Sequence, residues 1–219
     1  SSDNAIEIKS NSVTIENMTL QGSSDSVLFA GSYNNLLLQN LSISAADSNN
    51  GIKFDGTSSS TISNVTVNGT DRKSVLFEDV STITVKNSFF KNASSSHGFE
   101  ISDGSSSVVL DNVFIHNAGY SGSSAYGLYI SNSSGVTIKN NTKGGDSKTY
   151  ELYANGASTL KVQNSTFIGS NLALIEDSDG FLIEKSTFKD SSNGDYGVYI
   201  KNTDSGTFKD NTILNSASD

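Results

Sequence analysis

Five side chains capable of acid–base chemistry recur in consecutive segments of the sequence: Lys53, Lys73, His97, Glu100 and Tyr129. Together they could supply a base, an acid and a charge neutraliser for β-elimination. The alternative interpretation is a solvated edge of charged residues that carries a surface histidine. No catalytic residue is assigned from this cluster.

Six of the eight tyrosines fall in a repeated Tyr-x-x-Tyr element. They are Tyr126, Tyr129, Tyr150, Tyr153, Tyr196 and Tyr199. If the strands that carry them stack about 4.8 Å apart, the rings form a flat ladder on which sugar rings can lie, with phenol hydroxyls left to bond sugar hydroxyls. The element therefore predicts a carbohydrate-binding face. The alternative is that aromatic residues favour strands and cover the sheet.

A row of acidic residues follows the same strands into their turns. The row consists of Asp55, Glu78, Asp79, Asp103, Glu176 and Asp177. Carboxylate oxygens suit calcium, but Asn132 and Asn155 interrupt the row, and such residues also make a solubilising turn face. His116 is predicted to lie on a different face from His97. We therefore predict no metal site and no cofactor.

A repeat that runs along the whole chain positions these side chains. Its bend residues are Asn17, Asn40, Asn64, Asn87, Asn112, Asn140 and Asn164, followed by Lys185 and Asp210, in steps of 23, 24, 23, 25, 28, 24, 21 and 25 residues. Asparagine tolerates the left-handed conformation that a sharp bend requires. Short alternating strands in a repeat of this length predict a solenoid, and the unbroken register predicts one domain over residues 1–219.

Apolar residues stand two positions before each bend residue and three after it, and only Lys143 breaks the second row. A further strand in each coil carries an inward apolar pair around one outward residue. In the second coil the pair is expected at Val27 and Phe29, which places Leu28 outward. The expected outward residues are Glu7, Leu28, Lys53, Leu76, Glu100, Tyr129, Tyr153, Leu174 and Tyr199.

The bend asparagines, the inward pairs and the strands that open with glycine, such as Gly51-Ile-Lys-Phe54 and Gly127-Leu-Tyr-Ile130, resemble the right-handed parallel β-helix of the pectate lyase-like superfamily. The resemblance covers the whole chain. It implies an all-β fold, a right-handed parallel β-helix solenoid of about nine three-strand coils with an asparagine ladder. Adhesin-like and surface-layer-like proteins share this architecture.

The same superfamily includes lyases, hydrolases, epimerases and tailspikes, so the resemblance does not imply one activity. Its lyases use an arginine or lysine base beside a bound cation, whereas this chain has a single arginine, Arg72, in a loop. Its polygalacturonases use several aspartates with a histidine and an arginine. Asn202-Thr203-Asp204 is similar to one of their motifs, but it follows its strand instead of preceding it.

Composition excludes several classes of partner. The net charge of −9, with 14 scattered basic residues, argues against nucleic acid and anionic membranes, and no stretch has the apolar length of a membrane span. The absence of cysteine excludes disulfides and thiolate metal sites. Richness in Ser, Asn, Thr and Gly with acidic charge is typical of exported microbial proteins, so we expect an extracellular or cell-surface location.

These patterns favour a non-catalytic, adhesin-like β-helix module that binds a polysaccharide or a host or cell-surface glycan along its tyrosine face. The alternative is a polysaccharide lyase or epimerase that acts on an acidic glycan. The chain begins in register at Ala5 and ends just past the strand at Ile213, with no capping element. Open coil ends expose strand edges, which predicts head-to-tail self-association; the alternative is an excised fragment.

Overall fold

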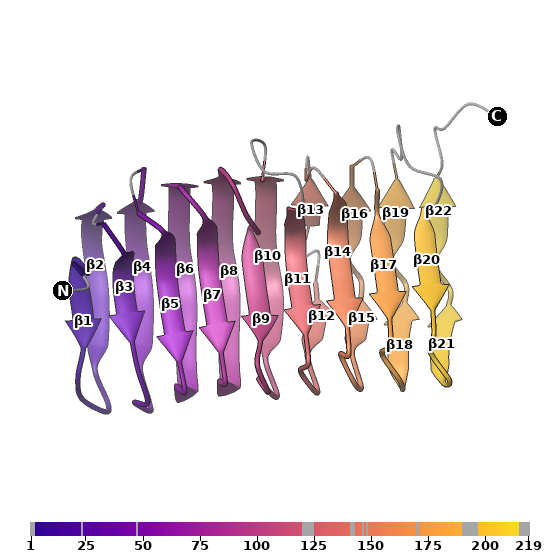
Figure 1. Ribbon diagram of the computed structural model, residues 1–219, viewed down its shortest axis with the longest axis horizontal. Coiled ribbons are helices and arrows are strands. Elements are labelled where there is room, and N and C mark those ends of the chain that lie inside the picture. Colours follow the sequence, from indigo (N-terminus) through magenta and orange to yellow (C-terminus); the bar gives the residue numbers. More distant parts are fainter. Residues whose placement is uncertain are drawn as a thin grey trace.

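The computed structural model describes residues 3–22, 24–46, 48–119, 125–140, 143–145, 147, 149–169, 171–189 and 197–214. All the regular secondary structure in these ranges consists of β-strands, and the strands of consecutive coils pair in parallel. The coils follow one another in sequence order along a single axis (Figure 1). This is the predicted all-β parallel solenoid. No helix in the described part of the chain is long and apolar enough to span a membrane.

One face of the solenoid is a nine-stranded parallel sheet, called here the first sheet (Figure 1). Its strands, in spatial order, are β1 (Ile6–Ile8), β3 (Ser26–Ala30), β5 (Asn50–Asp55), β7 (Lys73–Glu78), β9 (Phe99–Ser102), β11 (Tyr126–Ser131), β14 (Tyr150–Asn155), β17 (Ala173–Glu176) and β20 (Val198–Lys201). Each strand pairs with the strand of the next coil, so equivalent side chains form columns across the sheet.

The second sheet covers the opposite side and bends at the predicted bend residues. Its early strands run continuously through the bend: β2 (Thr14–Gln21), β4 (Leu37–Ser44), β6 (Ser58–Thr70), β8 (Ser81–Ala93) and β10 (Val109–Ala118). Later coils divide into β12 (Thr137–Lys139), β15 (Lys161–Gln163), β18 (Phe181–Glu184) and β21 (Gly206–Lys209) before the bend, and β13 (Lys143–Gly145), β16 (Thr166–Ile168), β19 (Thr187–Lys189) and β22 (Thr212–Leu214) after it. The predicted three-strand coil therefore applies literally only to the later coils.

All nine predicted bend residues adopt a left-handed backbone, with φ between 50° and 59°. In the early coils their side chains form the predicted ladder: the Nδ2 of Asn40 donates to Oδ1 of Asn17 at 2.9 Å, and that of Asn64 to Asn40 at 3.2 Å. Asn140 departs from this pattern and donates to Asp111 instead. The ladder supplies partners for amide groups that the bend turns outward.

A second asparagine ladder lies on the strands after the bend. The Nδ2 of Asn92 donates to Oδ1 of Asn68 at 2.7 Å, and that of Asn117 donates to Asn92 at 2.8 Å. Asn92 and Asn117 also have positive φ. The sequence analysis did not predict this ladder.

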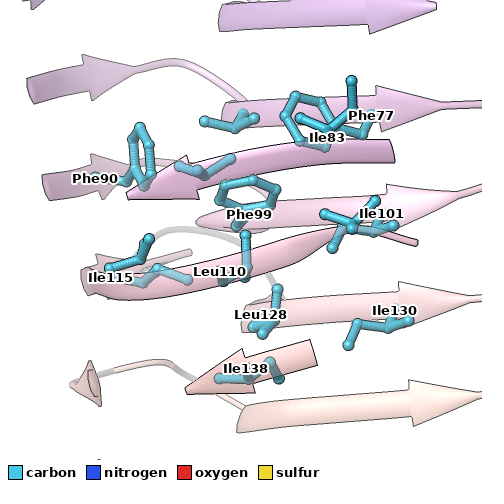
Figure 2. Close-up of a cluster of buried hydrophobic side chains, with 14 of the residues drawn as sticks. Phe77, Ile83, Phe90, Phe99, Ile101, Leu110, Ile115, Leu128, Ile130 and Ile138 are labelled. Atoms are coloured by element: carbon cyan, nitrogen blue, oxygen red, sulfur yellow. The ribbon is translucent and has the colours of Figure 1, made fainter. Parts of the chain in front are cut away.

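The core is a thin apolar column enclosed by the two sheets (Figure 2). Phenylalanines stack along it from coil to coil: the ring centroids of Phe54 and Phe77 are 5.4 Å apart, and those of Phe77 and Phe99 are 5.1 Å apart. The burial of each such side chain contributes roughly 1.5 to 3 kcal/mol. Lys143, expected to break the column, lies in β13, and its side chain is outside the described ones.

The second coil has a different register from the expected one. Leu28 pairs with Ile6 and Ile52 in the inward column and is fully buried, whereas Phe29 pairs with Glu7 and Lys53 in the outward column. The prediction that Leu28 faces outward was therefore wrong. Val27, Leu28 and Phe29 form an unbroken apolar run, and such a run has no alternation from which to choose a face.

Candidate functional site

Two columns of outward side chains cross the first sheet from β5 to β14. The column expected from the sequence contains Lys53, Leu76, Glu100, Tyr129 and Tyr153, and strand pairing confirms its register. The neighbouring column lies three residues earlier in each coil and contains Asn50, Lys73, His97, Tyr126 and Tyr150. The candidate site is the surface made by these two columns.

Four tyrosines on two adjacent strands form a cluster, called here the tyrosine cluster: Tyr126, Tyr129, Tyr150 and Tyr153. Ring centroids are 5.3 Å apart for Tyr126 and Tyr129, 4.8 Å for Tyr126 and Tyr153, and 5.5 Å for Tyr129 and Tyr153. All four side chains are half-buried. Desolvation by burial raises the pKa of Tyr126 and Tyr153, which keeps both phenols neutral and able to donate hydrogen bonds.

The rings of the cluster pack against one another instead of lying side by side as a flat ladder. The centroid of each ring lies within 6.5 Å of the centroids of at least two other rings of the cluster. The ring of His97 also lies against Tyr129. Part of each aromatic face is therefore covered by a neighbour. A ligand on this surface meets ring edges, hydroxyl groups and the remaining outer faces.

Tyr199, another tyrosine of the predicted site, is not part of the cluster. Tyr199 lies on β20, where it pairs with Leu174, and Leu174 separates it from Tyr153. Tyr199 is among the exposed large side chains. Tyr196 lies outside the described residues.

The hydroxyl of Tyr153 is held in a polar network at one side of the cluster. It donates to Oε2 of Glu176 at 3.0 Å and accepts from Nδ2 of Asn155 at 3.0 Å. The Lys201 ammonium lies 2.5 Å from Oε1 of the same glutamate. The hydrogen bond from Lys201, followed by that from Tyr153, lowers the pKa of Glu176. This network fixes the orientation of the Tyr153 ring.

At the other side of the cluster, Lys73, His97 and Glu100 form a contact network. Nζ of Lys73 lies 2.8 Å from Oε2 of Glu100, and Nε2 of His97 lies 3.6 Å from the same oxygen. The backbone N–H of Tyr126 donates to Nδ1 of His97 at 3.2 Å. In the neutral ring the proton is therefore on Nε2, directed towards Glu100.

The environment of His97 favours its neutral form. Burial, and then the positive charges of Lys73 and Arg72, lower the pKa of His97 to about 4. The imidazole also stacks on Tyr126 with ring centroids 5.0 Å apart, and its centroid is 4.7 Å from that of Tyr129. His97 thus joins the charged residues of the site to the tyrosine cluster.

A polar cleft of about 430 Å³ adjoins these residues on the side of β3, β5 and β7. It is lined by Asn4, Asp25, Phe29, Asn49, Asn50, Lys53, Asp55, Arg72, Lys73, Leu76 and Glu78. Nζ of Lys53 lies 2.7 Å from Glu78 and 3.8 Å from Asp55. The guanidinium of Arg72 makes no ion pair in the described part of the chain.

The structure brings together four of the five residues first singled out, namely Lys73, His97, Glu100 and Tyr129. Lys53 instead neutralises the nearby acids. Among the described residues, no group of three His, Cys, Asp or Glu side chains could hold a metal ion. Cleft residues from the connections between strands, such as Asn49, were missed because connections have no period from which to infer their placement.

Residues 1–143 match the family model described as right handed beta helix region, and the chain belongs to this family. Residues 116–219 also match the family model described as periplasmic copper-binding protein (NosD). The comparison with curated proteins gave no match. The predicted right-handed parallel β-helix is thereby confirmed.

Solved structures of the same architecture have little sequence in common with this chain. A tailspike of an Acinetobacter phage has a TM-score of 0.62 at 11% identity, covering 74% of this chain and 30% of its own. An alginate lyase from Paenibacillus has a TM-score of 0.55 at 9% identity, with 97% and 87% covered. The A-module of a mannuronan C-5 epimerase from Azotobacter vinelandii has a TM-score of 0.59 at 12% identity, with 97% and 59% covered. The chain thus spans less than two thirds of the tailspike and of the epimerase module.

The residues present do not fit a copper site. Copper in proteins is held by imidazole, thiolate and thioether ligands. The segment that matches the copper-binding family contains one histidine, His116, and no cysteine or methionine. His116 lies on β10 with its ring 5.8 Å from that of Phe114, on the second sheet and away from His97.

Proposed function

We propose that this chain binds a polysaccharide across the outer face of the first sheet, with the tyrosine cluster at the centre of the binding surface. The observation that carries this proposal is the cluster itself, in which four half-buried rings with hydroxyl groups gather on one face of the sheet. Aromatic rings with hydroxyl groups suit sugars, which have apolar faces and many hydroxyls. The surface from β5 to β14 spans four strand steps, about 19 Å, and suits an extended chain of sugars.

The geometry favours binding over catalysis. Glu100 is almost fully buried and engaged by Lys73. The neutral His97 holds its Nε2 proton towards that same carboxylate, so Nε2 is not free to act as a base. The pKa of Tyr126 is raised, which is the wrong direction for a tyrosinate base. Lys73, His97 and Glu100 are thus engaged with one another.

We further propose that the molecule is an exported or cell-surface module of adhesin type. The match of residues 116–219 to a family described as periplasmic supports export. Fractionation of the native host cells, followed by protease treatment of intact cells, tests this location. Protection of the chain inside the cytoplasm contradicts it.

A glycan array with the purified chain, followed by calorimetry, tests the binding surface. Replacing both Tyr129 and Tyr153 with alanine should weaken binding about tenfold or more, because two aromatic contacts and two hydroxyls are removed. Leu174→Ala is the matched control: it lies in the same column on the next strand and should leave binding unchanged. Unaltered affinity of the double variant contradicts the proposal.

The second candidate function is a polysaccharide lyase or epimerase that acts on an acidic glycan. It is favoured by one observation: Lys73, His97 and Glu100 meet beside Tyr129, at the edge of a cleft that contains Arg72. Incubation with pectin, alginate and glycosaminoglycans, monitored by ultraviolet absorbance for unsaturated products and by NMR for inversion at C5, tests it. Turnover that Lys73→Met and His97→Gln abolish, with binding retained, would establish catalysis, whereas the absence of product from every acidic glycan removes this candidate.

A further inference from the structure

One position in the inward lining of the first sheet is mostly occupied by small residues, and Glu151 departs from this rule. The position directly precedes each inward pair. In the described coils it is held by Ala5, Val27, Gly51, Ser74, Gly98, Gly127, Glu151, Leu172 and Gly197. The lining is tight where glycine occurs: a Cβ at Gly51 would lie 2.3 Å from Val67, and one at Gly98 would lie 2.4 Å from Ile115.

The carboxyl group of Glu151 is fully buried and lies in a space that two glycines leave open. A Cβ at Gly169 would lie 2.1 Å from its Oε1, and a Cβ at Gly127 would lie 3.0 Å from its Oε2. The carboxyl oxygens accept hydrogen bonds from the backbone N–H of Ser147 at 2.7 Å and from its hydroxyl at 2.9 Å. The neighbouring coils are therefore shaped to admit this side chain.

These hydrogen bonds begin a series of contacts that leads to the tyrosine cluster. Ser147 and Thr149 belong to the connection that precedes β14. The backbone N–H of Thr149 donates to the carbonyl of Ala125 at 3.0 Å, and the N–H of Ala125 donates to the Thr149 hydroxyl at 3.2 Å. The next residue, Tyr126, donates its N–H to His97. Tyr150 lies between Thr149 and Glu151 in the chain.

We infer that Glu151 is a positioning residue for the tyrosine cluster: it holds the connection before β14 from the interior and thereby sets where Tyr150 and Tyr126 stand on the surface. This role rests on the proposed polysaccharide-binding function of the cluster. Buried carboxyl groups are unfavourable unless they are hydrogen-bonded, and coils with glycine at this position form the same strand. The strand itself does not require Glu151, whereas the arrangement of the tyrosines beside it does.

The experiment compares three single variants of the full chain by far-ultraviolet and near-ultraviolet circular dichroism and by glycan binding. Glu151→Gly installs the residue found in four other coils and should keep the β spectrum. It should reduce the near-ultraviolet signal of the packed tyrosines and weaken binding about tenfold. Glu151→Gln should retain both signals, because its amide oxygen can accept from the Ser147 N–H and its amide nitrogen can donate to the Ser147 hydroxyl. Ser74→Gly, at the same position in another coil, is the control and should change neither.

An unchanged tyrosine signal and unchanged binding in Glu151→Gly overturn the inference. If this variant does not fold, Ser147→Ala replaces it: loss of one hydrogen bond should shift the tyrosine signal in the same direction, and an unaltered signal overturns the inference. If the parent chain binds no glycan, the proposed function fails, and the tyrosine signal alone still decides whether Glu151 positions the rings.

Discussion

At the scale of single residues, the burial of polar groups determines the protonation state of the site. His97 lies among two cations, a carboxylate and two aromatic rings. Its protonation adds a third positive charge to a poorly solvated place, and the protein therefore keeps the ring neutral. A neutral His97 preserves the hydrogen bond from the Tyr126 backbone to Nδ1.

The depressed pKa of His97 predicts a dependence of stability on pH. The unfolded chain takes up a proton near pH 6.5, whereas the folded chain takes it up near pH 4. Between these values the unfolded state binds more protons, so the free energy of unfolding should fall by about 3 kcal/mol as the pH is lowered from 6.5 to 4. Urea unfolding at several pH values measures this fall.

His97→Gln should flatten that pH profile, since the variant has no imidazole to protonate. Lys73→Met removes a charge that lowers the pKa of His97 and should move the lower end of the window to higher pH. A profile that is identical in the parent and in His97→Gln contradicts the assignment.

The Glu176 network predicts a local titration effect. Tyr153→Phe removes the hydroxyl that donates to Glu176, and Lys201→Met removes the ammonium. Both substitutions should raise the pKa of Glu176, with the larger rise for Lys201→Met because its hydrogen bond is the main cause of the depression. NMR titration of the side-chain carboxyl measures both values. A pKa of Glu176 that neither substitution moves shows that the network does not form in solution.

At the scale of elements, the bends determine the shape of each coil. A left-handed backbone costs roughly 1 to 2 kcal/mol for residues other than glycine and asparagine. Asn87 has φ of 50° and accepts a hydrogen bond from Nδ2 of Asn112 at 3.0 Å. Lys185 adopts φ of 52° at the same bend in a later coil.

Asn87→Leu should lower the free energy of unfolding by about 1 to 3 kcal/mol, because it strains the bend and leaves Asn112 without its acceptor. The reverse change, Lys185→Asn, should raise it by about 1 kcal/mol, since asparagine suits the conformation already adopted there. Denaturant unfolding measures both, with far-ultraviolet spectra to verify that the β content is retained. Equal stabilities of the parent and both variants would show that leucine and lysine adopt the left-handed bend as readily as asparagine does.

At the scale of the whole molecule, the last described coil differs from the middle of the solenoid. Ile200, Ile213 and Leu214 are 41%, 48% and 54% exposed, although Ile200 and Ile213 continue columns that are buried in earlier coils. Apolar side chains of β20 and β22 are therefore accessible in the described part of the chain. Exposed apolar side chains favour contact with another apolar surface.

Head-to-tail association between copies remains a prediction of this surface. Light scattering of the parent chain should show an average mass that rises with concentration, and Ile213→Lys should suppress the rise because it places a charge in the contact. Ser134→Lys, at an exposed position in a middle coil and away from both ends, is the control for added charge. A parent that stays monomeric at high concentration contradicts the prediction.

The architecture of this protein was determined by the sequence itself. The spacing of the bend asparagines and the alternation around Val85 and Phe99 specify a solenoid because each coil needs only its neighbours for burial. The same periodicity placed Tyr129 and Tyr153 in one outward column, since equivalent residues of stacked coils must align. Where alternation failed, as at Leu28, the prediction of the buried face failed with it.

Only the tertiary structure decided how these aligned side chains interact. Periodicity gives the column of a residue but not its rotamer. The sequence therefore does not predict how the tyrosine rings pack against one another or that Lys73 pairs with Glu100. The buried place of Glu151 was equally hidden, because it depends on the space left by Gly127 and Gly169 in other coils. Local sequence sets the backbone of each coil, whereas contacts between coils join residues more than twenty positions apart and follow from volume and charge in three dimensions.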